Sequence, residues 1–194
     1  MKLEYLGDAL DHWKGSLFEY LKAEGTLNEL AVDPMATDRD SWKEGDLQIY
    51  ARLLHVERHL IIPHRARLAD REQYFAEITH NGDLFLDPDT GIATSHTSQA
   101  EKYVRRKELA ALLRHPESRV VIVYQHIRAQ KTRERIKKCV DVVKQEVEPV
   151  RWCSYESPTA AMLFLCNDGA RIGRVQEALN TLLGGQAEKR VGHA

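Results

Sequence analysis

The sequence predicts an α/β protein whose doubly wound, mostly parallel sheet carries helices on both faces and has an antiparallel strand at one end. Short apolar runs alternate with amphipathic helical patterns along most of the 194 residues. The strongest run, 120–124, is apolar on both faces, as in central parallel strands that helices cover. Two later runs, 150–155 and 161–166, flank a turn-like Glu156-Ser-Pro-Thr159 segment, which predicts an antiparallel hairpin.

The first third of the chain begins with a helix and a strand. Apolar side chains spaced by three and four positions between residues 6 and 21 predict the helix, and Gly25 fits just past its end. The run 30–32 predicts a buried strand, which the proline after Asp33 ends. A capping-box pattern beginning at Ser41 opens a second helix.

The remaining elements follow the same alternation. A short strand is expected at 60–62, and a helix over 70–80 ends at an Asn-Gly pair. Residues 83–87 predict a compact buried strand with a carboxylate at its carboxyl end. Three more helical patterns are expected, over 104–114, 136–147 and 172–182.

Composition indicates a single domain. No internal repeat, low-complexity tract or Gly/Ser linker divides the chain, so we expect one domain over 1–186 and a polar, frayed tail over 187–194. The three cysteines are widely spaced and form no C-x-x-C pair, which argues against a disulfide framework or a cysteine zinc site. No run approaches the roughly 18–20 apolar residues of a membrane span, and no secretory segment is visible. We therefore expect a cytoplasmic protein with reduced thiols that does not enter a membrane.

The formal net charge of −1 hides a strong asymmetry. Residues 1–101 carry 10 basic and 19 acidic side chains, whereas residues 102–138 carry 12 basic and 3 acidic ones. The basic segment 102–138 is either a solvated helix face or a surface for the phosphate backbone of a nucleic acid. Both interpretations stay open on sequence alone.

Candidate site residues follow three of the predicted strands. Ligands of doubly wound sheets lie outside the carboxyl ends of the strands, where this chain places Asp33, Asp87-Pro-Asp-Thr-Gly91 and Gln125-His126. Asp87 and Asp89 are suited to acid–base chemistry or to binding an amine, and His126 is suited to acting as a general base. The simpler interpretations are an ordinary Asp-Pro-Gly turn and a capping histidine.

Two alternative functions use the same residues. In the first, a metal-dependent nuclease or phosphodiesterase, Asp87 and Asp89 bind the metal and His126 is the base. Pro88-Asp89 with Glu101-Lys102 partly matches the PD-(D/E)xK nuclease pattern, but here the acid and the lysine are adjacent, in a stretch whose pattern predicts a helix. In the second, a non-catalytic scaffold binds nucleic acid or a partner protein through its basic face.

Three segments carry a resemblance to known families. They are Leu6-Gly-Asp-Ala-Leu-Asp11-His-Trp-Lys14, the strand end at Asp33, and the motif Leu84-Phe-Leu-Asp87-Pro-Asp89. Together they resemble, distantly, the bacterial large-subunit rRNA adenine-N6 methyltransferases, a class I (Rossmann-like) family. A closer resemblance, over nearly the whole chain, is to a bacterial family of unassigned function with Phe-Leu-Asp-Pro-Asp-Asn-Gly, Glu-Lys-Tyr-Val and Tyr-Gln-His motifs.

The methyltransferase resemblance implies a function and a set of roles. It implies a methyltransferase-like fold that binds S-adenosylmethionine, acts on nucleic acid and needs no metal. Asp11 and Lys14 would help to hold the cofactor, and Asp33 would lie at the end of the first strand. Asp87 with Pro88 would hold the amino group that is methylated. Without this resemblance, Asp11 and Lys14 read most simply as a surface ion pair on the first helix.

Overall fold

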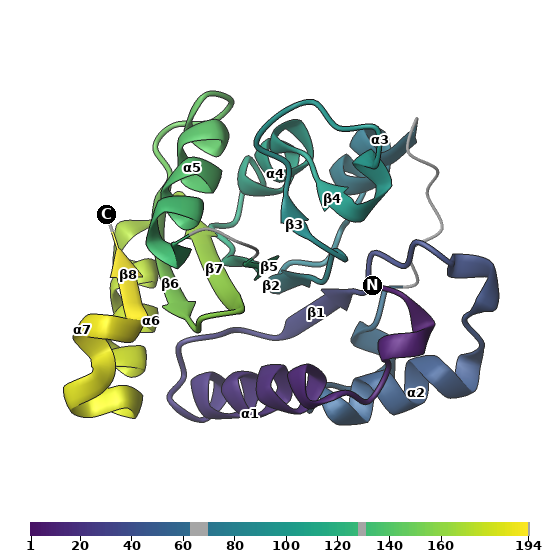
Figure 1. Cartoon of the computed structure of the whole chain (residues 1–194), viewed down its shortest axis with the longest axis horizontal. Helices are drawn as coiled ribbons and strands as arrows, with labels where there is room; N and C mark the ends of the chain where they lie inside the picture. Colours follow the sequence, from purple (N-terminus) through teal and green to yellow (C-terminus); the bar gives the residue numbers. More distant parts are fainter. Residues whose placement is uncertain (63–69, 128–130, 194) are drawn as a thin grey trace.

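A six-stranded mixed sheet forms the centre of the protein, whose computed structural model describes residues 1–62, 70–127 and 131–193 (Figure 1). In chain order the strands of this sheet are β1 (Leu30–Asp33), β2 (Asp83–Leu86), β5 (Val121–His126), β6 (Arg151–Glu156), β7 (Ala160–Cys166) and β8 (Val191–His193). Their spatial order is β1-β2-β5-β7-β6-β8. β1, β2 and β5 are parallel, and β7 is antiparallel to both β5 and β6. The predicted α/β class and the mostly parallel sheet are therefore confirmed. The antiparallel strand expected at one end is present as β8, which pairs antiparallel with β6 at the edge, and β7 is a second reversed strand inside the sheet.

Helices cover both faces of this sheet (Figure 1). On one face lie α1 (Ala9–Ala23), α2 (Glu44–Leu53) and α6 (Gly169–Leu183), and on the other lie α3 (Arg71–Ala76), α4 (Arg106–Leu113) and α5 (Thr132–Lys144). Successive side chains of each strand point to opposite faces of the sheet and so contribute to two separate cores. In β5, Ile122 packs with the first group of helices, and Val121 and Val123 pack with the second. The apolar run that predicted a central strand is thus buried on both faces.

Helix α1 forms for local reasons that the sequence already indicates. The Asp8 side chain accepts hydrogen bonds from the backbone N–H groups of Leu10 and Asp11 at 2.8 and 3.1 Å and so caps the first turn. Phe18 packs edge-on against Phe85 of β2, with ring centroids 4.8 Å apart. The helix therefore has a fixed position against the sheet, with its N-terminus near the carboxyl ends of the strands.

Two segments have a different secondary structure from the one that the sequence predicted. The expected strand at 60–62 is a 3-10 turn, Arg58–Leu60, and a single parallel bridge between Val32 and Ile61. The run is too short to form a ladder of its own. The expected frayed tail is instead helix α7 (Ala187–Arg190) followed by β8, and Tyr155 pairs with a buried Val191. Pairing with the edge of β6, burial of Val191, packing of Ala187 against the core and a hydrogen bond from Arg133 to the Val191 carbonyl hold this segment.

A small parallel ribbon, which the sequence did not predict, stands beside the main sheet. It consists of β3 (Gly91–Ile92) and β4 (Tyr103–Val104). The segment before β4, expected to be helical, is a single 3-10 turn, Ala100–Lys102. Strands of two residues carry no periodicity, so hydrophobic patterns do not reveal them.

The cysteines Cys139, Cys153 and Cys166 are buried free thiols. Burial raises the pKa of Cys139 to about 11. Within the described ranges, no helix has the length and apolar character that crossing a membrane requires.

Candidate functional site

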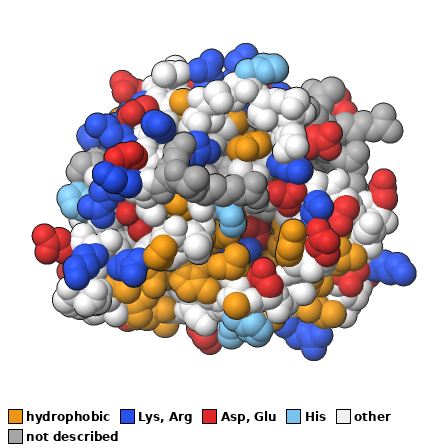
Figure 2. Space-filling view, in the orientation of Figure 1, with side chains coloured by type: hydrophobic (Ala, Val, Ile, Leu, Met, Phe, Trp, Pro, Cys, Tyr) orange, Lys and Arg blue, Asp and Glu red, His pale blue; other side chains and the backbone are white. Residues whose placement is uncertain are grey.

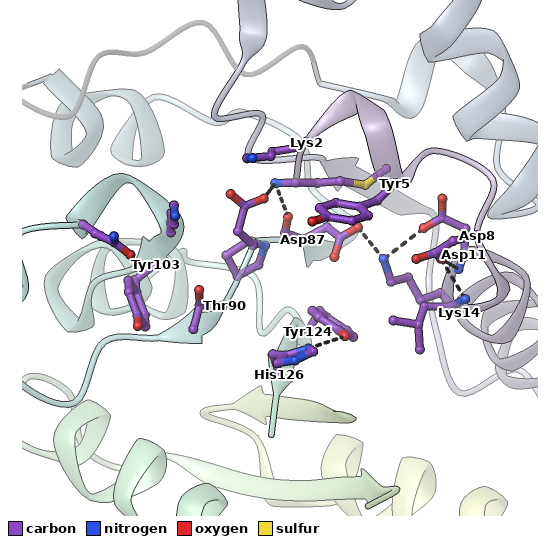
Figure 3. A pocket seen from close by; sticks show the side chains of 16 residues that line it. Lys2, Tyr5, Asp8, Asp11, Lys14, Asp87, Thr90, Tyr103, Tyr124 and His126 are labelled. Carbon is purple, nitrogen blue, oxygen red and sulfur yellow. Dashed lines mark hydrogen bonds and ion pairs between the residues drawn. The ribbon is translucent and has the colours of Figure 1, made fainter. Parts of the chain in front are cut away.

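The site lies where the parallel strands β2 and β5 end, beneath the first residues of the chain (Figure 3). A cavity of about 480 Å³ opens there, a size within the range of small-molecule sites. The sequence-predicted residues that line it are Asp11, Lys14, Asp87, Pro88, Asp89 and His126. Segments far apart in the sequence therefore meet at one edge of the sheet, as the strand-end argument predicts.

A buried ion-pair network forms the base of the cavity. The Lys14 ammonium donates to Asp87 Oδ2 at 2.6 Å and to Asp11 Oδ1 at 3.0 Å, and the Tyr50 hydroxyl donates to the same Asp87 oxygen at 2.6 Å. These side chains are nearly inaccessible to solvent, with Asp11 1%, Asp87 2% and Lys14 4% exposed. Burial lowers the pKa of Lys14, but the charges of Asp87 and Asp11 outweigh it and leave the pKa above its ordinary value. Lys14 is therefore a fixed ammonium group.

Helix α1 places the ion-paired side chains of Asp11 and Lys14 on its side that faces the cavity. Asp11 and Lys14 are three residues apart, so they share a helix face. The backbone N–H of Gly7 donates to Asp11 Oδ2 at 2.9 Å, which leaves both carboxylate oxygens bonded. Burial raises the pKa of Asp11, with Lys14 opposing it. The interpretation as a surface ion pair was wrong, because the first turns of α1 lie against the sheet edge.

The Asp87-Pro-Asp-Thr-Gly91 loop is held by a residue to which the sequence assigned no role. The Gln125 side chain donates to the carbonyl of Thr90 at 3.0 Å and accepts from the backbone N–H of Ile92 at 2.9 Å. It is fully buried, and it lies so close to Gly91 that a Cβ there would stand 2.2 Å from Gln125 Oε1. Gln125 therefore positions the loop. Through its side chain, the Tyr-Gln-His motif is hydrogen-bonded to the loop that carries the Asp-Pro-Asp motif.

Replacing Gly91 with alanine should lower the free energy of unfolding by about 1–3 kcal/mol, since Gly91 has a φ of +123° and no room for a Cβ. Urea unfolding followed by circular dichroism measures the change. Gly45→Ala is the matched control, because Gly45 lies in α2 and a Cβ would meet nothing within 4 Å. That variant should be neutral or stabilised by about 0.5–1 kcal/mol. Equal stability of the two variants would contradict the proposed fit of Gly91 against Gln125.

Asp89 is bonded through both of its carboxylate oxygens. Oδ1 lies 3.0 Å from the α-ammonium of Met1, and Oδ2 accepts from the Thr37 hydroxyl at 2.9 Å. The same ammonium donates to the backbone carbonyls of Pro34, Met35 and Asp87 at 2.9–3.0 Å. Asp89 thus fastens the start of the chain to the sheet edge.

Two predicted residues lie differently with respect to the cavity. His126 lines it, and its Nδ1 is 3.3 Å from the hydroxyl of Tyr124. Burial raises the pKa of Tyr124 to about 12, although the charge of Lys14 opposes the rise. Asp33 does not line the cavity. Its side chain is fully buried and accepts from the Met35 backbone N–H and the Tyr74 hydroxyl.

The arrangement does not favour a metal site. Asp87 is bound to Lys14, and Asp89 is bound to the α-ammonium of Met1, so each carboxylate already has a cation. Among the described residues, no group of three or more His, Cys, Asp or Glu side chains is arranged to hold a metal ion. These described residues therefore do not fit a metal ion as the alternative nuclease function requires.

The carboxyl end of β1 also does not fit S-adenosylmethionine. The methyltransferase resemblance implies a glycine-rich turn there, so that backbone can approach the cofactor, but residues 33–44 contain no glycine. The carbonyls of Pro34 and Met35 accept hydrogen bonds from the ammonium of Met1, and Asp33 does not line the cavity.

Several residues of the site escaped the sequence analysis. Tyr5, Asp8, Tyr103 and Tyr124 line the cavity, and Tyr50 bonds to Asp87 from beneath it. Asp8, Tyr103 and Tyr124 lie within the motifs quoted for the resemblances, but those motifs assigned them no role, and Tyr5 and Tyr50 had no signal. The tyrosines come from a 3-10 turn, the two-residue strand β4, the end of β5 and helix α2, so their convergence depends on tertiary structure.

The basic residues of segment 102–138 do not form one continuous charged surface in the folded protein. Arg119 is buried, and Arg105, Arg106, Lys131 and Arg133 form ion pairs with nearby glutamates. Residues 128–130 lie outside the described part of the chain. Figure 2 shows Lys and Arg side chains gathered on the part of the surface that α5 occupies in Figure 1. The segment therefore contributes exposed cations mainly at the start of α4 and along α5.

No protein-family model matches this chain, and no curated protein matches its sequence.

Proposed function

We propose that this protein binds nucleic acid and accommodates in its cavity one base that carries an exocyclic amino group. The proposal treats the sheet as Rossmann-like and methyltransferase-like, which is supported by the parallel strands β1, β2 and β5 with β7 reversed beside them. In such sheets ligands lie at the carboxyl edge, which is the location of the cavity.

The observation that carries the proposal is the unused oxygen of Asp87. Oδ2 accepts from both Lys14 and Tyr50. In the described part of the chain, Oδ1 accepts no hydrogen bond, and Asp87 lines the cavity. A carboxylate oxygen that faces a cavity is an acceptor for an N–H donor of a ligand, such as the amino group of adenine or cytosine. The bonds from Lys14 and Tyr50 to Oδ2 fix the orientation of the carboxylate.

Aromatic rings provide a second kind of contact. Figure 3 shows Tyr5, Tyr103 and Tyr124 around the open space next to Asp87. Tyr5 is 54% exposed and therefore accessible to a ligand. Stacking of a base on an aromatic ring contributes about 1–3 kcal/mol and tolerates any base. Tyrosines would therefore hold the ring of the base, and Asp87 would select the amino group.

The charge distribution suits a polyanion outside the cavity and a hydrogen-bond donor within it. Asp8, Asp11, Asp87 and Asp89 line the cavity together with Lys14 and the Met1 ammonium. Lys2 and Lys102 also belong to the lining. An amino-bearing base in the acidic part and a phosphate near the lysines would satisfy both kinds of group.

The expected result is a preference for the amino group itself. A short single strand containing one adenine in a uridine background should bind about five- to a hundredfold more tightly than the same strand with purine, which lacks the amino group. This range corresponds to the roughly 1–3 kcal/mol of a specific base contact. Fluorescence anisotropy at low salt measures both affinities. Equal affinities, or no binding of either strand, would refute the proposal.

Asparagine at position 87 makes the test specific to this side chain. Lys14 and Tyr50 both donate toward Oδ2, so the amide oxygen of Asp87→Asn should stay there and its NH₂ should replace Oδ1. The adenine preference should then disappear. Asp141→Asn is the matched control, because it makes the same change at an exposed position of α5 that does not line the cavity, and it should keep the wild-type preference.

A further inference from the structure

A second cavity, of about 430 Å³, lies beyond the β3–β4 ribbon. Its walls come from the loop after β3, the start of α4, and α3 and α5. Its polar lining includes Thr94 and His96 of the loop and Arg105, Arg106 and Lys107 at the start of α4. This cavity contains none of the residues of the first one.

Cations predominate around this second cavity. Arg105 is bonded to Glu108 and lies 3.9 Å from Glu72, the one carboxylate among the described residues that line the cavity. Arg106 is 2.9 Å from Glu146 and 46% exposed, so it remains accessible. Lys107 is exposed and forms no ion pair within the described ranges. Three cations and one carboxylate thus line the cavity. Arg105 and Arg106 are paired with Glu108 and Glu146 outside the lining, and Arg106 also donates to Gln145 Oε1 at 2.6 Å, so Lys107 supplies the additional positive charge.

The loop wall of this cavity is fixed from α5. Arg135 donates to the Thr94 hydroxyl at 2.6 Å and to the carbonyl of Ile92 at 2.8 Å. Val142 of the same helix lines the cavity. Helix α5 therefore forms one wall of the cavity and holds the loop that forms another.

The ribbon connects the two cavities directly. Thr90 lines the first cavity and Ala93 the second, while Lys102 lines the first and Arg105 the second. β3 and β4 are parallel, so both strands lead the same way from one cavity to the other. Three residues of extended chain span about 10 Å, which is short enough for one polynucleotide to reach both.

We propose that the second cavity binds a backbone phosphate of the same polynucleotide whose base enters the first cavity. The proposal rests on the function proposed above. It assigns Arg106 and Lys107 to the phosphodiester, and it assigns Arg135 to positioning the loop that closes the cavity. Single-stranded nucleic acid is the occupant, because the base in the first cavity must be unpaired to enter it.

A length series separates the two proposals. The ligands are adenosine monophosphate and oligoadenylates of two to six nucleotides, and the protein variants are wild type and Arg106→Ala/Lys107→Ala. In wild type, affinity should rise once the strand reaches both cavities. The double variant should bind the mononucleotide as wild type does and should show little of that rise. Its salt dependence should weaken by about 0.7 in log–log slope for each phosphate that the variant no longer binds.

Arg174→Ala/Lys189→Ala is the matched control, because it removes two exposed cations from α6 and α7 and should retain the rise. If the control weakened the increase of affinity with strand length as much as the double variant does, the cause would be a general charge effect, and the assignment of Arg106 and Lys107 to the phosphate would be wrong. No rise in wild type, despite mononucleotide binding, would overturn the second cavity alone. Absence of all binding would overturn both proposals.

Inorganic phosphate is the second probe. Raising its concentration should compete with the oligonucleotide in wild type and much less in the double variant. If phosphate stabilises wild type against heat more than the double variant and no rise with strand length is seen, the cavity binds a free phosphate ion, and the polynucleotide assignment is wrong.

Discussion

Replacing Lys14 with methionine is expected to lower the free energy of unfolding at pH 7 by about 3–5 kcal/mol. The substitution removes the ammonium that lies between Asp87 and Asp11 and leaves two carboxylates buried without it. Tyr50 still donates to Asp87 but carries no charge. Urea unfolding monitored by tryptophan fluorescence measures the loss of stability.

The pH dependence of that variant distinguishes charge burial from poorer packing. Burial raises the folded-state pKa of Asp11 above its ordinary value, and the charge of Lys14 opposes that rise. Without Lys14, the pKa of Asp11 should therefore rise further. Protonation then relieves the penalty below the unfolded pKa, and the penalty grows as the pH rises through the folded pKa. The difference from wild type should therefore be smaller at pH 4 than at pH 7. Lys14→Arg, which keeps the charge, is the control and should be less destabilised. A destabilisation that is equal at both pH values would contradict this account.

Removing the carboxylate of Asp83 should have a similarly large effect, about 3–5 kcal/mol. Asp83 is fully buried at the start of β2. Its oxygens accept from the backbone N–H groups of Val120 and Asn28 at 2.7 Å and from the Arg171 guanidinium at 2.8 Å. Asp83→Ala leaves those donors unpaired, with Arg171 only 8% exposed.

Two further variants test this explanation by chemical denaturation. Asp83→Ala/Arg171→Met removes both charges and should recover part of the stability, since the unpaired buried cation is gone. Arg58→Ala breaks an ion pair with Glu44, whose side chain is 63% exposed, and should cost less than about 1 kcal/mol. If Arg58→Ala were as damaging as Asp83→Ala, burial would not be the cause.

Hydrophobic patterns predicted the sheet and most helices because those elements are long enough to show a period. The apolar runs around Ile122 and Phe164 form paired, fully buried strands. The β3–β4 ribbon was missed because its strands have two residues each. The edge strand at Val191 was missed because its stability comes from pairing with β6 and not from its own sequence.

The candidate site was predictable where chemistry follows a strand end, as for Asp87 and His126. It was not predictable where a residue acts through tertiary contacts. Gln125 reads as an ordinary polar residue after a strand, yet its amide holds the Asp-Pro-Asp loop. Asp33 reads as an equivalent strand-end carboxylate, yet it bonds to Met35 and Tyr74 and does not line the cavity.

The reversed strand β7 has a consequence for how specificity could change. Because β7 runs against β5, the β6–β7 turn, and not another strand end, stands beside His126, which pairs with Ala160. The backbone N–H of Ile127 bonds to the carbonyl of Thr159 in that turn at 2.8 Å. Surface turns accept insertions readily. Lengthening this one would add new side chains beside His126 while every strand pairing of the core is kept. The turn is thus a natural position for diversification, in evolution or in the laboratory.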